Sequence, residues 1–116
     1  MSLETQLVTT LSTLCPRVFP DVADTSTARP YITYQQFGGK ADTYTEGVVP
    51  NIRNARMQIN VWSTTKSEVI ALMLQIESLL AASMEATAES ALYSVFDDDD
   101  LDLRGCAQDF SIWASR

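Results

Sequence analysis

The chain has 116 residues, 46% of them hydrophobic and 20% charged, which is enough for one domain, residues 1–116, with a modest core. The net charge is −7 and the eight basic residues are scattered from Arg17 to Arg116, so we expect no direct or sequence-specific nucleic-acid binding. Because histidine is absent and no catalytic, cofactor-binding or metal-binding constellation is found, we expect neither an enzyme nor a bound cofactor or metal.

The first elements are a short helix, a loop and a strand. Ser2 is a suitable N-cap, and Pro16 ends the helix at or before Cys15. Four leucines form its apolar stripe: Leu3, Leu7, Leu11 and Leu14. Residues 16–29 have the composition of a loop, and residues 30–37 are rich in β-branched and aromatic side chains, which predicts a strand.

The second strand and the second helix follow a long connection. Residues 40–53 are too many for a tight turn and predict an extended loop or hairpin arm before a strand over residues 53–63. Thr65 and Glu68 have the spacing of a capping box. A helix then runs to about Met84, and its apolar stripe consists of Val69, Leu72, Met73, Ile76 and Leu79.

Two more strands complete the predicted fold. We expect them over residues 90–96 and 106–114, joined by the aspartate-rich residues 97–105. The fold class is therefore α+β, with the order α-β-β-α-β-β. An antiparallel sheet of about four strands has the long helix packed on one face. The shorter N-terminal helix is the other helical element.

Aromatic side chains are expected on the sheet face opposite the long helix. If that helix covers Met57, Ile59 and Val61, then Trp62 and Trp113 point to the other side, with Arg56 beside them and Tyr93 joining in one register. Three explanations remain open. The first helix covers this face, the indoles fold over the sheet rim, or a partner subunit covers a surface made of Arg56, Trp62, Tyr93 and Trp113.

The acidic run is the most conspicuous polar feature. It consists of Asp97, Asp98, Asp99, Asp100 and Asp102. The spacing partly matches a calcium loop, but Leu103 stands where that loop needs glycine and the flanking segments are predicted strands. A solvated loop between strands, or an electrostatic surface that repels or guides something negatively charged, is the better interpretation.

Cysteine use and apolar runs bear on the compartment. Cys15 and Cys106 are far apart and form no CxxC, which predicts two buried thiols in a reducing compartment, although the sequence leaves a disulfide open. The longest apolar run, residues 69–74, is far below the roughly 20 residues of a membrane span, and no signal-peptide pattern is present. We expect synthesis in the cytoplasm and no membrane partner.

Three segments carry a resemblance to a known family: PYITYQQFGG (30–39), NARMQINVWSTTKSEVIALMLQIESLL (54–80) and GCAQDFSIWA (105–114). They resemble the tail completion proteins of long-tailed bacteriophages and prophages, also called tail terminators or head–tail joining proteins. The resemblance implies a structural part that forms a ring, commonly a hexamer. Such a ring completes the tail tube and joins it to the head connector while DNA passes through the lumen. In such a ring we expect the aspartate loop to face the lumen or a partner. The resemblance implies no catalytic or ligand residues.

The resemblance also implies where the protein acts and what it contacts. The expected partners are copies of itself, the tail tube protein and the head connector proteins, and the expected places are the bacterial host cytoplasm during assembly and the tail or neck of the virion. The alternative is a small intracellular α+β binding or regulatory module whose aromatic sheet face takes a protein or a small ligand.

Overall fold

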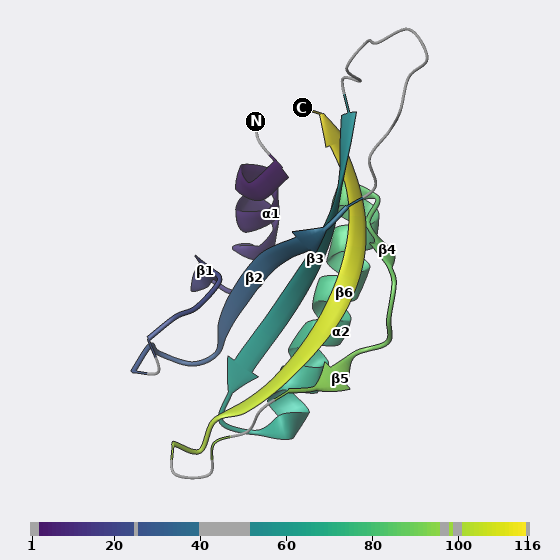
Figure 1. Ribbon diagram of the computed structural model, residues 1–116. Coiled ribbons are helices and arrows are strands. Elements are labelled where there is room, and N and C mark those ends of the chain that lie inside the picture. Colours follow the sequence, from purple (N-terminus) through teal and green to yellow (C-terminus); the bar gives the residue numbers. More distant parts are fainter. Residues whose placement is uncertain (1–2, 25, 40–51, 96–97, 99–100, 116) are drawn as a thin grey trace, which may run out of the picture.

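A computed structural model describes residues 3–24, 26–39, 52–95, 98 and 101–115 of the chain (Figure 1). Its helices are α1 (Leu3–Leu11) and α2 (Lys66–Met84). Its strands are β1 (Val18–Pro20), β2 (Tyr31–Gly38), β3 (Ile52–Ser63), β4 (Thr87–Ala88), β5 (Tyr93–Ser94) and β6 (Arg104–Ser115). The predicted arm between β2 and β3 falls on residues 40–51, which lie outside the described residues, as does the predicted cap Ser2.

The sheet has six strands in the order β1-β2-β3-β6-β4, and β5 also pairs with β6. The pairs β2–β3 and β3–β6 are antiparallel, as predicted, and β3 and β6 align over 12 residues. The prediction of about four strands, all antiparallel, is wrong in two respects: the sheet has six strands, and one pair of them is parallel. β1 pairs in parallel with β2 inside the segment predicted to be a loop. This strand has three residues and ends in Pro20, so its pairing comes from the neighbouring strand rather than from its own propensity.

The predicted strand over residues 90–96 is right only in part: β5 (Tyr93–Ser94) lies within it, but the chain beside β6 is broken into β4 and β5. Between them, side chains take the bonds that a continuous ladder would use. The Asp109 N–H donates to Ser90 Oγ (3.2 Å), and the buried Gln108 donates through Nε2 to the Ser90 carbonyl oxygen (2.8 Å). Serine and glutamine side chains that bond to the backbone therefore interrupt the pairing.

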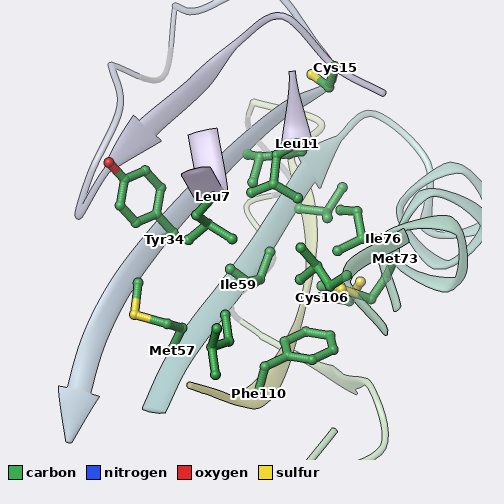
Figure 2. Packing of buried hydrophobic residues seen from close by; sticks show 14 of the residues in the cluster. Leu7, Leu11, Cys15, Tyr34, Met57, Ile59, Met73, Ile76, Cys106 and Phe110 are labelled. Carbon is green, nitrogen blue, oxygen red and sulfur yellow. The ribbon is translucent and has the colours of Figure 1, made fainter. Parts of the chain in front are cut away.

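Both helices pack on the same face of the sheet, which places the hydrophobic core in one layer (Figures 1 and 2). Figure 2 shows side chains from α1, β3, β6 and α2 meeting there. α1 contributes Leu3, Leu7 and Leu11, and α2 contributes Val69, Met73, Ile76 and Leu80. The stripe predicted for α2 is right at Val69, Met73 and Ile76 and differs at two positions. Leu80 is buried in place of Leu79, and Leu72 is only partly buried. The first helix does not cover the aromatic face, so that explanation is wrong.

Both ends of α2 are fixed by capping residues. Thr65 is the N-cap, in extended geometry (φ −122°, ψ 148°), and its Oγ1 accepts from the Glu68 N–H (3.3 Å). At the other end Glu85 is left-handed (φ 52°), and the Ala86 N–H donates to the Leu80 carbonyl oxygen (3.2 Å). Within the described residues α2 is the one helix long and apolar enough to cross a membrane, a criterion that core helices also meet.

The cap gives a first prediction. Thr65→Ala removes the hydroxyl that satisfies the Glu68 N–H and should lower the free energy of unfolding by about 1 kcal/mol. Thr64→Ala, next to it and also exposed, is the matched control and should change it by less than about 0.5 kcal/mol. Urea unfolding followed by circular dichroism measures both, and equal losses would contradict the capping role.

Both cysteines are buried free thiols, so no disulfide joins them. Cys15 donates through Sγ to the Pro30 carbonyl oxygen (3.3 Å), and Cys106 donates to that of Val69 (3.4 Å). Burial raises the pKa of Cys106 to about 11, an effect that the positive charge of Lys66 slightly opposes. Because the raised pKa favours the neutral thiol in the folded state, its stabilising contribution is complete below pH 9. It is lost as the pH rises from 9 toward 11.

This thiol should therefore be unreactive in the folded protein. In a Cys15→Ser variant, iodoacetamide at pH 8 should modify Cys106 more than about tenfold faster in concentrated urea than in buffer. Mass spectrometry of timed samples measures the two rates. Similar rates in both solutions would mean that the site opens freely and that the core described above is wrong there.

Candidate functional site: the open face of the sheet

The face of β2, β3 and β6 opposite the two helices is called the open face here. In Figure 1 the ribbons of β3 and β6 pass in front of α2, so the reader looks onto the open face. The strand register brings Arg56, Trp62 and Trp113 to this side, and Tyr93 reaches it from β5. The structure thus brings all four residues predicted for an interface to one face of the molecule.

Trp62 lies at one end of the open face and is partly buried within its own subunit. Its ring stacks on Tyr31 with 6.4 Å between ring centroids, and its Nε1 donates to Thr33 Oγ1 (3.1 Å). Opposite Trp62 on β6 is Gly105, where a Cβ would come within 2.6 Å of the indole. Trp62 is therefore fixed in place against the sheet and is not a free anchor.

The centre of the open face is a chain of hydrogen-bonded polar side chains. Gln35 Nε2 donates to Gln58 Oε1 (3.3 Å), and Gln58 Nε2 donates to the Tyr93 hydroxyl (2.9 Å). That hydroxyl donates to Asp109 Oδ1 (3.1 Å). Partial burial raises the pKa of Tyr93, and the bond to Asp109 raises it further, while the bond from Gln58 lowers it. The chain ties β2, β3, β5 and β6 together across the face.

Arg56 lies between this polar centre and the far end. Its Nη2 and Nε are 2.7 Å and 2.8 Å from Glu89 Oε2, and its guanidinium carbon lies 5.0 Å from the centre of the Phe37 ring. A cation over an aromatic face is a favourable arrangement. Arg56 is therefore pre-positioned on the surface by an ion pair and a ring contact.

Trp113 is at the opposite end and is 43% exposed. Its partner on β3 is Asn54, which precedes Trp62 by 8 residues, roughly 26 Å along a strand. The two indoles therefore do not form one cluster. They mark the two ends of a long surface with a polar middle.

The acidic loop joins the end of the open face near Trp62. Asp98 and Leu103 exchange backbone hydrogen bonds (2.8 and 2.9 Å), and Asp98 Oδ1 accepts from the Leu101 N–H (3.2 Å). Asp102 is left-handed (φ 50°), and its carbonyl oxygen accepts from Arg29 Nη1 (2.8 Å). Asp97, Asp99 and Asp100 lie outside the described residues. In the described part of the chain, no three acidic or thiol side chains group as metal ligands.

Strand alternation in the sequence places Gln58 on the side of Trp62 and Asp109 on the side of Trp113, and the structure confirms both. Sequence reasoning did not predict the hydrogen bonds that join them, and it missed Gln35 in the polar chain and Phe37 and Glu89 around Arg56. Glu89 could not be found from strand alternation, because it lies outside a regular strand.

A second uncovered surface lies on the side of α2 that points away from the sheet. It is called the outer side of α2. Exposed small and apolar residues follow each other there at intervals of three, four and three: Ala71, Leu74, Ser78 and Ala81. Leu74 is 51% exposed. The outer side of α2 and the open face of the sheet thus lie on opposite sides of the subunit.

Comparison with known proteins identifies the family of the chain. No curated protein matches the chain. The family model described as "Tail completion protein gp17" matches residues 3–115, nearly the whole chain. The resemblance noted in the sequence is thereby confirmed. The chain belongs to the gp17 family of tail completion proteins, and its role is that of a structural protein of the phage tail.

Proposed function

We propose that copies of this chain associate head to tail into a ring that completes the tail tube and joins it to the head connector. In this ring the centre and far end of the open face, where Tyr93, Arg56 and Trp113 lie, pack on the outer side of α2 of the next subunit, and the end beside Trp62 stays open. One observation carries the proposal: among the described residues, the subunit has two different uncovered surfaces on opposite sides. Contacts between unlike surfaces form closed rings when the rotation between subunits closes, whereas pairing of like surfaces forms dimers.

The composition of the two surfaces supports this pairing. The open face offers the exposed side chains Trp113, Tyr93 and Phe37, together with Arg56, and such residues are enriched at protein interfaces. The outer side of α2 offers Leu74 among small residues, which allow a sheet to approach closely. Arg56 and Tyr93 are already held by bonds within the subunit, so little side-chain freedom is lost on association.

The charge of the chain suits a channel for DNA. With a net charge of −7 and no basic cluster, a ring of these subunits would repel the phosphate backbone and not hold it. DNA could then pass without being bound. We place assembly in the host cytoplasm and the finished ring at the tail or neck of the virion.

The first test of the proposed ring concerns the outer side of α2. Leu74→Glu would place a charge inside the proposed interface and should abolish ring formation, seen by negative-stain imaging and sedimentation, with an unchanged circular dichroism spectrum. Leu101→Glu is the matched control, because Leu101 is 42% exposed but lies in the acidic loop. Rings that persist in Leu74→Glu would exclude α2 from the interface.

The open face is tested at its far end. Trp113→Ala removes an exposed indole and should weaken self-association at least about tenfold without changing unfolding by more than about 0.5 kcal/mol. Sedimentation over a concentration series gives the association constant, and Phe110→Ala on the core side of the same strand is the contrasting variant. Phe110→Ala should unfold the subunit instead. If Trp113→Ala assembles normally, this end of the open face is not covered by a neighbour.

A further inference from the structure

A small pocket opens on the open face beside Trp62. Its volume is about 220 Å³, below the roughly 300–1,000 Å³ of pockets for drug-sized ligands. Tyr31, Thr33 and Trp62 line it from the sheet, and Asp21 and Val22 line it from the segment after β1. Asp98 and Leu103 complete the lining from the acidic loop. The size suits one inserted side chain.

The lining combines two kinds of group that select the same chemistry. The stacked rings of Tyr31 and Trp62 offer aromatic surface, which attracts cations and covers aliphatic chains. Two acidic residues, Asp21 and Asp98, also line the pocket, and Val22 next to Asp21 is 82% exposed. A long side chain with an apolar stem and a positive end, Arg or Lys, matches both the aromatic and the acidic parts.

The acidic run in the sequence, to which Asp98 belongs, adds a longer-range attraction. Asp98 belongs to the run that contains five aspartates between positions 97 and 102. Charges of one sign near a binding site raise the rate at which an oppositely charged partner arrives. The run would thus guide the same basic group that the pocket accepts.

We propose that this pocket binds an Arg or Lys side chain presented by a different protein of the tail, which gives the acidic loop a partner-facing role. The proposal rests on the proposed function only in assuming that such neighbours exist. A second copy is a weaker source as far as the structure describes it, because the five of its eight basic side chains that are described are already engaged. Each one bonds within its own subunit: Arg17, Arg29, Arg56, Lys66 and Arg104.

The test uses the full chain labelled with ¹⁵N and a small probe, N-acetyl-arginine methylamide. The indole N–H of Trp62 lines the pocket, and that of Trp113 at the other end of the same face is the internal control. A Trp113→Phe variant assigns the two signals. We expect the Trp62 signal to shift with saturation at about millimolar probe, while Trp113 stays unchanged. The matched neutral probe, N-acetyl-citrulline methylamide, should leave both signals in place.

The second part of the test removes the negative charge of each aspartate in turn. Asp21→Asn and Asp98→Asn should each weaken probe binding about two- to fivefold, as for a partly exposed ion pair. Asparagine keeps the side-chain oxygen that accepts from the Leu101 N–H, so the loop should stay folded. Glu77→Gln, on α2, is the matched control and should not change the affinity. Equal shifts with both probes, or no loss in the two aspartate variants, would overturn the proposal.

Negative-stain imaging of the same variants tests the pocket proposal separately from the proposed ring. Asp21→Asn and Asp98→Asn should form rings as the unchanged chain does. If they lose the ring, the basic group comes from a second copy, and the assignment to a different protein is wrong. If the chain forms rings but its Trp62 signal does not shift with the arginine probe, the pocket proposal is refuted and the proposed function is not.

Discussion

The pairing of β3 with β6 decides the arrangement of nearly everything else in the subunit. The two strands align over 12 residues without a shift in register. Because side chains alternate along a strand, this one alignment sends Val61 and Cys106 to the helices and Trp62 and Gly105 to the open face. A slip of one residue would reverse both sets and expose the core.

The same alignment explains why the helices share a face. The apolar side of β3 and β6 needs a cover. Only two residues separate the end of β3 from the start of α2, and the second of them, Thr65, caps the helix. α1 then fills the area over β2 beside α2, with Leu7 and Leu11 in the common layer (Figure 2). Neither of the two helices found in the described residues covers the opposite face. Its polar groups satisfy each other through the chain from Gln35 to Asp109.

An open face built this way serves a structural protein of a tail better than it serves a ligand-binding module. Its middle is polar and internally bonded, so it tolerates water before assembly, while apolar side chains at its ends remain available. The exposed residues on the outer side of α2 give the subunit a second, different surface. In the proposed ring, a protein that must both pack against copies of itself and meet other tail parts needs more than one such surface.

The sequence by itself determined the two helices, the three long strands, and the sides on which Trp62 and Trp113 lie, because these follow from periodicity and from the Thr65 cap, which are local. It also indicated the family, through the three quoted segments, which all lie within the residues that the family model matches. Only the tertiary structure decided the parallel β1, the break between β4 and β5, and the burial of Leu80 in place of Leu79. It also decided the pocket, in which Asp21, Trp62 and Asp98 meet. Those features depend on contacts between segments distant in the chain, and no local pattern encodes which distant partner supplies a hydrogen bond or covers a side chain.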